Sequence, residues 1–483
     1  MTKLMFPAFL FLALAAGAAQ NQQTPEASVD ELKGLLLQQK ELIESQAKEL
    51  EDLKKRLSDV EALALTSHNR LEEISQQPAE PSVSAAVEQR LEELEQQVQK
   101  IPEAPAEVVD VDQFPGSFRI PGTDAAMKVG GQVRMSVVKT LGPLGVDDKF
   151  VTSSIPIEGT QEAGKGDRLT YSARPSRLNF DFRTLTGVGS VRAFLEADFA
   201  GGSTNSFRLR HAYGQWGKWL GGQTWSTFAD PAAEPDGIDF EGLNAISLFR
   251  QPQIRWTREF GKNASLSIAA ENPSPDVTGA TGVNQAPDMV VRLRLDNREF
   301  PLFSFLAKGG HTQAALLGRQ IRAEAPDQPN DTVSTGGFGA NVSGQMFTRW
   351  RDGRDNFTYA MNGGKGIGRY ITDLGSLGGQ DAVYDAETNS LESLTVFAPY
   401  IGFQHWWGES LRSTWTYGFV QVQNLDIQTS DSLHQTHRWT ANLAWSPILR
   451  LDLVFEYLAG VRINKDRESG FSDQIQVGGT FRF

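Results

Sequence analysis

The 483-residue chain contains no cysteine, which excludes disulfides, cysteine-ligated zinc, a thiol nucleophile and lipidated cysteine. Basic residues are not in excess either: 46 Lys and Arg stand against 59 Asp and Glu, a net charge of -13, which argues against nucleic acid as a partner. No run of about 20 apolar residues follows the N-terminus, so a bundle of membrane-spanning helices is excluded. The six histidines stand in no recognisable nucleophile motif, and no carboxylate cluster has metal-ligand spacing. We therefore expect no enzyme, no catalytic residue, no cofactor and no metal.

The N-terminus has the pattern of a secretory signal peptide. Lys3 supplies a positive charge, residues 4–15 are apolar, and small residues follow at 16–18. The apolar run is shorter than the about 18 residues that the alternative, a membrane anchor, would require. We predict removal of residues 1–18 and export of the rest.

Charge and aromatic residues divide the exported chain into two parts. Residues 1–124 hold 11 Lys and Arg and 22 Asp and Glu, which leaves 35 and 37 for residues 125–483. All ten Trp, all eight Tyr and 42 of the 46 Gly lie in the second part. The acid excess therefore belongs to the first part, and the material for an aromatic-rich fold belongs to the second.

A heptad repeat occupies much of the first part. Taking Val29 as position a, the a and d positions are Val29, Leu32, Leu36, Gln39, Ile43, Gln46, Leu50, Leu53, Leu57, Val60, Ala64, Ser67, Leu71 and Ile74. Such a seam is buried only against other copies, so it predicts an oligomeric coiled coil, with two or three strands, rather than a single solvated helix. A shorter register follows over residues 87–101. We predict a coiled-coil stalk over 19–112 and, from its Pro and Gly residues, a linker over 113–124.

From residue 125 the hydrophobic period becomes two. Met127, Val129, Val133, Met135 and Val137, for example, alternate with polar residues, which is typical of a strand with one apolar and one polar face. We count sixteen such segments, starting near residues 127, 169, 188, 206, 217, 246, 263, 288, 303, 334, 356, 394, 410, 434, 448 and 472.

Many of these segments reach 10 residues, and Trp and Tyr stand near their ends, as in transmembrane barrels. We therefore predict an all-β membrane protein, a 16-stranded antiparallel transmembrane β-barrel over 125–483, preceded by the N-terminal α-helical coiled coil. Hydrocarbon offers no partner for backbone N–H and C=O groups, so the sheet must close. An even strand number puts both ends of the barrel on the periplasmic side, which places the stalk in the periplasm and the barrel in the lipid of the outer membrane.

Four segments carry a resemblance to a known family: Phe118-Arg-Ile-Pro-Gly-Thr123, Ala173-Arg-Pro-Ser-Arg-Leu178, Phe207-Arg-Leu-Arg-His-Ala-Tyr213, and Gly222-Gln-Thr-Trp-Ser-Thr-Phe228 followed by Asp230-Pro231. Together with the acidic stalk and the linker they resemble the DcaP-like porins. The resemblance implies a homotrimer of sixteen-stranded barrels in a Gram-negative outer membrane, with a periplasmic coiled coil, that takes up small, mainly anionic solutes such as dicarboxylates. General porins and phosphate-selective porins share this architecture and remain alternatives.

A porin needs no catalytic group, only a water-filled lumen with charges at its narrowest part. The long acidic segment from Asp230 to Asn244 follows the fifth strand, where the resembled family has a loop that folds into the lumen. We expect it to be the constriction loop, with an exposed flexible loop as the alternative. After Asp230 itself, its acidic residues are Glu234, Asp236, Asp239 and Glu241.

Arginines recur on the inward faces of the predicted strands: Arg134, Arg174, Arg177, Arg192, Arg208, Arg210, Arg255, Arg292 and Arg294. A planar, permanently charged guanidinium matches a carboxylate bidentately. Each of them could alternatively be a salt-bridge partner for an acidic residue in the wall. We expect the set to line a pore that prefers anions.

A second class of function is mechanical. At about 1.5 Å per residue the 46 residues of the first heptad run would reach roughly 70 Å into the periplasm, far enough to touch peptidoglycan or a periplasmic partner. The stalk could therefore tether the outer membrane to the cell wall, or it could simply hold the trimer together.

Overall fold

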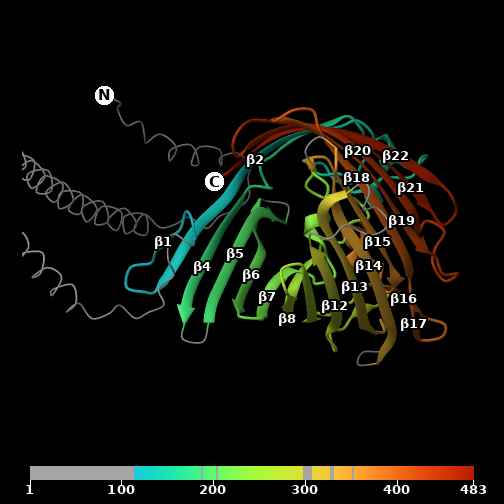
Figure 1. Ribbon diagram of the computed structural model, residues 1–483. Coiled ribbons are helices and arrows are strands. Elements are labelled where there is room, and N and C mark those ends of the chain that lie inside the picture. The colour runs from blue at the N-terminus through green and yellow to red at the C-terminus, as the bar shows by residue number, and fades with distance from the viewer. Residues whose placement is uncertain (1–113, 187–188, 203–204, 297–306, 327–330, 351–352) are drawn as a thin grey trace, which may run out of the picture. The chain divides into compact units, whose positions relative to one another are not determined.

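The computed structural model describes residues 114–186, 189–202, 205–296, 307–326, 331–350 and 353–483. The predicted signal peptide and the predicted coiled coil lie outside the described residues. The rest forms a closed barrel of sixteen antiparallel strands, and the strand count predicted from the sequence is confirmed (Figure 1).

The barrel strands follow one another around the wall in chain order. They are β2 (Ala125–Thr140), β4 (Arg177–Thr186), β5 (Gly189–Gly201), β6 (Ser206–Trp216), β7 (Trp219–Trp225), β8 (Arg250–Phe260), β9 (Ala264–Glu271), β12 (Asp288–Asp296), β13 (Ala307–Glu324), β14 (Thr332–Thr348), β15 (Asn356–Lys365), β18 (Thr395–Trp406), β19 (Leu411–Gln423), β20 (Leu433–Ile448), β21 (Leu451–Asn464) and β22 (Ser469–Arg482). The last strand pairs with the first from Gln132↔Arg482 to Thr140↔Gln474, which leaves no free edge.

Alternation along each strand separates the two faces of the wall. On β2, Val133 is 60% exposed on the outside, while the next residue, Arg134, is 8% exposed on the inside. Successive side chains of a strand point to opposite faces, so a period-two sequence dictates an apolar outer wall and a polar lumen.

The second predicted strand, starting near residue 169, is interrupted in the structure. It consists of β3 (Arg168–Ser172) and β4, which both pair with β2. Pro175 lies in the break, and proline has no N–H to donate to a ladder. The Ser176 side chain fills the gap: its Oγ accepts a hydrogen bond from Arg134 N at 3.0 Å and donates to Arg134 O at 3.2 Å.

Smaller elements lie at the rims and in the loops. β1 (Phe118–Arg119) lies inside the predicted linker and pairs with β2, and β11 (Thr281–Gly282) pairs with β13. A separate small sheet contains β10 (Val277–Thr278), β16 (Ala382–Asp385) and β17 (Ser390–Ser393). Short helices are η2 (Thr152–Ser154), η3 (Glu162–Gly164), η4 (Pro231–Ala233), η7 (Gly368–Tyr370) and α3 (Thr372–Leu377). Among the described residues, no helix is long and apolar enough to cross a membrane.

The two ends of the barrel differ. The turn end carries Phe483 and tight connections such as the two residues between β6 and β7, whereas the loop end carries the long segments 141–167, 226–249 and 366–394. Side chains of the last two segments, among them Phe228, Ile246, Ile367 and Leu374, form an apolar cluster with inward residues of the wall. Part of the barrel interior is thus filled by loops, which restricts the open space.

Candidate transport pathway

Segment 226–249, between β7 and β8, reaches across the lumen to the opposite wall. At its start, Asp230 lies 2.8 Å from Nε2 of His311 on β13 and accepts a hydrogen bond from Ser343 Oγ on β14 at 2.9 Å. Further along, Tyr400 on β18 donates its hydroxyl to Ala233 O at 2.9 Å, and Asn244 binds Gly418 O on β19 at 3.3 Å. Successive contacts with β13, β14, β18 and β19 place the segment inside the barrel.

Three of the four acidic residues named from the sequence are occupied in fixing this segment. Arg412 Nε on β19 donates to Asp236 at 2.6 Å, and Arg438 Nη2 on β20 donates to Asp239 at 2.8 Å. Lys149 Nζ binds Glu241 at 2.6 Å. Their charges are therefore largely neutralised in place.

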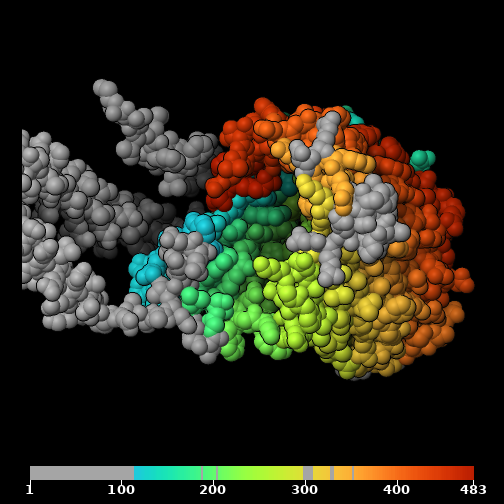
Figure 2. Space-filling view, in the orientation of Figure 1, coloured from blue at the N-terminus to red at the C-terminus, as the bar shows by residue number. Residues whose placement is uncertain are grey.

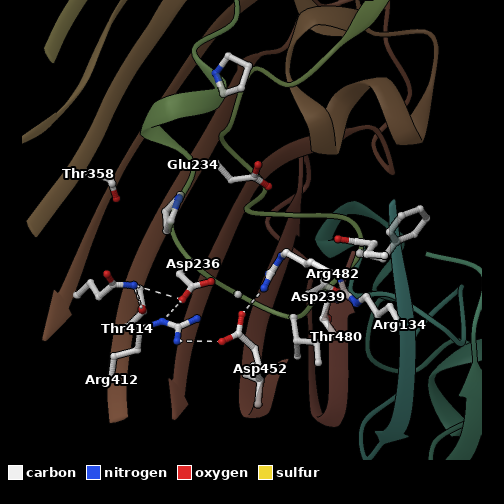
Figure 3. A pocket seen from close by; sticks show the side chains of 18 of the residues that line it. Arg134, Glu234, Asp236, Asp239, Thr358, Arg412, Thr414, Asp452, Thr480 and Arg482 are labelled. Carbon is white, nitrogen blue, oxygen red and sulfur yellow. Dashed lines mark hydrogen bonds and ion pairs between the residues drawn. The ribbon is translucent and has the colours of Figure 1, made fainter. Parts of the chain in front are cut away.

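Glu234 differs from the other three. Among the described residues its carboxylate has no hydrogen-bond or ion-pair partner, and its side chain is exposed to the lumen. In Figure 3 dashed lines join Asp236 to Arg412 and Arg412 to Asp452, but none reaches the Glu234 carboxylate. Glu234 thus presents an unpaired carboxylate to the open space. Its enclosure in the barrel raises the pKa of this carboxyl, and the positive charges of Arg177 and Arg210 oppose that shift.

Two cavities lie along the lumen, one toward each end. The cavity toward the turn end has a volume of about 630 Å³ and includes Arg134, Arg412 and Arg482 in its lining. The cavity toward the loop end has about 540 Å³ and includes Arg208, Arg210, Arg250 and Arg369. Arg177, Glu234 and Phe240 line both, so these three residues mark the junction between them. Figure 2 shows the hollow between the green early strands and the orange and red late strands.

Five of the nine arginines named from the sequence are paired with carboxylates. The ion pairs are Arg174–Asp148 at 2.9 Å, Arg192–Asp181 at 2.8 Å, Arg208–Asp198 at 2.7 Å, Arg210–Glu196 at 2.7 Å and Arg294–Asp230 at 3.3 Å. Arg174 also lies off the barrel strands, in the break before β4, contrary to its expected place on an inward strand face. Pro175 causes that break, and Arg174 instead ties the break to the loop containing Asp148.

The other four arginines have no carboxylate partner in the part of the chain that the structure describes. Arg292 donates to Ser267 Oγ at 2.9 Å, and Arg255 lines neither of the two cavities. Arg134 and Arg177 line the pathway, and Arg134 is buried with its Nε and Nη2 unbonded. These two, of the nine, offer unneutralised positive charge along the pathway.

Sequence reasoning missed several lining residues. Arg250 at the start of β8 faces the loop-end cavity without a carboxylate partner among the described residues, and its guanidinium lies 4.5 Å from the ring centre of Trp225. Arg412 and Arg482 line the other cavity. Both occupy polar positions of alternating strands, a signal present in the sequence. Arg250 had no such signal, because alternation places it on the same face of β8 as the exposed Ile254, away from the lumen.

Burial shifts the acidity of carboxyl groups in the loops. Burial raises the pKa of Asp230, but hydrogen bonds from His311 and Ser343 outweigh this effect and hold that pKa below its usual value. For Asp373 on α3, burial prevails over hydrogen bonds from Ser153 and Thr436 and raises the pKa to about 6. The first carboxylate is stabilised as an anion, while the second is not.

Comparison with solved structures supports the fold. The outer membrane channel DcaP of Acinetobacter baumannii matches with a TM-score of 0.66 at 22% identity, covering 76% of this chain and 100% of that chain. An anion-selective porin from Comamonas acidovorans gives 0.46 at 12% identity over 74% and 100%, and a trimer form of OmpT from Vibrio cholerae gives 0.44 at 10% identity over 74% and 99%. At TM-scores below 0.5, neither of these two supports an inference about this chain. A search of curated proteins gives no match.

A family model matches most of the chain. The model describes the DcaP outer membrane protein and matches residues 119–483, from β1 to the C-terminus. Family and fold place the protein in the outer membrane and point to a channel rather than an enzyme. The chain belongs to the DcaP outer membrane protein family.

Proposed function

We propose that the protein is a porin that lets small hydrophilic solutes diffuse passively across the outer membrane and prefers anions such as dicarboxylates. Segment 226–249 acts as its constriction loop. The loop end of the barrel faces the outside of the cell, and the turn end with the C-terminus faces the periplasm, as is usual for bacterial barrels.

The observation that carries the anion preference is the pairing pattern of the charges. Arg134, Arg177 and Arg250 lack carboxylate partners among the described residues, while on the constriction loop only Glu234 is unpaired. The lining of the loop-end cavity alone carries six cationic side chains and three carboxylates. An excess of unpaired cations along the pathway attracts anions and repels cations.

The test is a reversal potential in a planar bilayer. With a KCl gradient across a single reconstituted channel, we expect a reversal potential of the sign given by chloride permeating faster than potassium. Cation preference would contradict the proposal. Absence of any conductance would contradict the porin function itself and favour a structural role with a plugged barrel.

Two narrower alternatives concern the solute. A general porin would show no saturable interaction with succinate, and a phosphate-selective porin would be blocked by phosphate at lower concentration than by succinate. We expect succinate to reduce the chloride current at lower concentration than phosphate does, because arginine forks match carboxylates bidentately.

For the assembly, we propose a homotrimer held by the heptad segment, with the coiled coil in the periplasm. The apolar a and d positions support it, because such a seam is buried only between copies. Tethering to peptidoglycan or to a periplasmic partner through the same stalk is the second candidate function. The two are distinguished by the deletion described below.

A further inference from the structure

Unpaired charges of both signs line the junction of the two cavities. Arg177 and Glu234 line both cavities, so a solute that passes from one cavity to the other passes both residues. Within the described residues, no basic nitrogen lies within 4.0 Å of the Glu234 carboxylate. The two charges therefore do not cancel in a direct ion pair.

The Glu234 carboxylate stands on a backbone that is fixed on both sides. The preceding residue, Ala233, ends η4 and its carbonyl is held by Tyr400; the following residue is Pro235, and Asp236 is held by Arg412. Proline restricts the backbone at residue 235 further. The backbone that carries the Glu234 carboxylate thus keeps its place as solutes pass, and no backbone ordering is required when the carboxylate binds a cation.

The arginines opposite in charge to Glu234, Arg134 and Arg177, also have side-chain atoms without hydrogen-bond partners. Arg134 is more than nine-tenths buried, lines the turn-end cavity and leaves Nε and Nη2 without partners. Nε of Arg177 is likewise buried and unbonded. Buried donors without a protein partner are completed by ordered water or by a ligand, so these guanidinium groups have donors to offer a solute carboxylate.

This arrangement discriminates among solutes by the number and sign of their charges. A dianion is attracted by the arginines and repelled by Glu234, and a cation experiences the reverse. A solute with a carboxylate at one end and an ammonium group at the other is attracted by both sides. Its carboxylate matches the guanidinium fork and its compact ammonium group matches a single carboxylate.

We propose that, provided the porin function proposed above holds, the junction favours small zwitterions, with Glu234 binding the ammonium group and Arg177 the carboxylate, so that α-amino acids form a second class of transported solute. Glu234 is in this scheme a specificity-determining residue. Glu234 selects for the ammonium group, whereas the arginines bind the carboxylate of zwitterions and of anions alike.

The experiment compares three solutes with one carbon skeleton in proteoliposomes: alanine as zwitterion, lactate as anion and lactamide as neutral reference. Initial uptake of each isotopically labelled solute is expressed relative to lactamide. For the wild type we expect alanine to exceed lactamide by about threefold, the size of effect that a solvent-screened charge pair gives.

Three variants separate the contributions. Glu234→Gln should bring alanine down to the lactamide rate and raise lactate, whereas Arg177→Gln should lower alanine and lactate together. Glu162→Gln removes the same charge from exposed η3 in a loop and should change none of the ratios. An unchanged lactamide rate shows that each variant is folded and open.

The inference is overturned if wild-type alanine uptake equals that of lactamide, or if Glu234→Gln leaves the alanine ratio unchanged. The outcomes for the porin function are separate. Lactamide uptake no faster than in protein-free liposomes would overturn both proposals. Lactate slower than lactamide, with alanine still dependent on Glu234, would contradict the anion preference and support the zwitterion site.

Discussion

At the scale of single residues, an arginine in the lumen attracts a solute only where no carboxylate already neutralises it. Arg208 and Arg210 share Asp198 as a partner, so together they contribute less than their number suggests. Arg177 and Arg250 contribute their full charge to the loop-end cavity. Selectivity therefore depends on pairing, and arginine content alone does not determine it.

Replacing Arg177 by Gln should weaken anion preference more than replacing a paired arginine. We expect the chloride-to-potassium permeability ratio to fall about two- to fivefold, which corresponds to roughly 0.5–1 kcal/mol of screened interaction. The measurement is the reversal potential in a KCl gradient. Arg467→Gln, in an exposed loop, serves as the charge-matched control. Equal shifts of the reversal potential in both variants would show that Arg177 has no specific role in selectivity.

Asp373 gives the docking of segment 366–394 a dependence on pH. Its carboxylate accepts hydrogen bonds from Ser153 N and Thr436 Oγ1, each at 2.8 Å, but burial raises its pKa to about 6. The pKa of Asp373 in the folded protein exceeds the unfolded value of about 3.9, so the folded state favours the protonated carboxyl group. The stability that protonated Asp373 contributes to the docking is therefore full below about pH 4 and is lost as pH rises through about 6.

Hydrogen exchange of segment 366–394 tests this. After correction for intrinsic rates, we expect wild-type protection to fall between about pH 4 and pH 7, and Asp373→Asn to show a weaker dependence because its amide does not ionise. Asp466→Asn, which alters an exposed loop, should retain the wild-type dependence. A wild-type profile that is flat across this range would contradict the prediction.

At the scale of elements, segment 226–249 is held in the lumen mainly by charged side chains of the wall. Arg438 is 2% exposed on β20; it donates to Asp239 at 2.8 Å and to Phe150 O at 2.8 Å. The Glu456 carboxylate on β21 accepts hydrogen bonds from Ile238 N and Asp239 N, each at 2.8 Å. The loop is therefore fixed by a cationic donor and a carboxylate acceptor on two neighbouring strands of the wall.

Substituting Asp239 by Asn should loosen this loop. Removing one partner of a buried ion pair leaves Arg438 uncompensated, at a cost of about 3–5 kcal/mol. We expect a larger and noisier single-channel conductance, because the loop would leave its place in the lumen for part of the time. Conductance and noise equal to those of the wild type would show that the remaining contacts hold the loop unaided.

At the scale of the whole molecule, the net charge of -13 divides into -11 for residues 1–124 and -2 for residues 125–483. The acid excess thus does not describe the barrel, whose 35 basic residues include those of the lumen. The acidic net charge of the whole chain is therefore compatible with a pore that prefers anions, because most of the excess acid lies outside the barrel.

Deleting residues 27–101 tests what the heptad segment does. If it holds the trimer, the barrel should migrate as a monomer on an unheated gel while the full-length protein migrates as a trimer. Trimers that survive the deletion would instead favour the tethering role. Heating both samples provides the monomer standard.

The sequence by itself determined the barrel, because a period of two over long segments has one solution in a membrane. Each of the sixteen predicted starts lies within four residues of an observed start. The division of the second strand into β3 and β4 follows from Pro175, and the Ser176 side chain takes the place of the missing ladder bonds at Arg134.

Only the tertiary structure decided which charges remain unpaired. Arg210 and Arg177 look alike in sequence, yet Arg210 meets Glu196 and Asp198 while Arg177 meets no carboxylate among the described residues. Partners such as Arg438 and Asp239 are 199 residues apart, and no local pattern reports a contact at that distance. Strand periodicity is a local property of the chain, whereas charge pairing across a lumen depends on how the barrel closes.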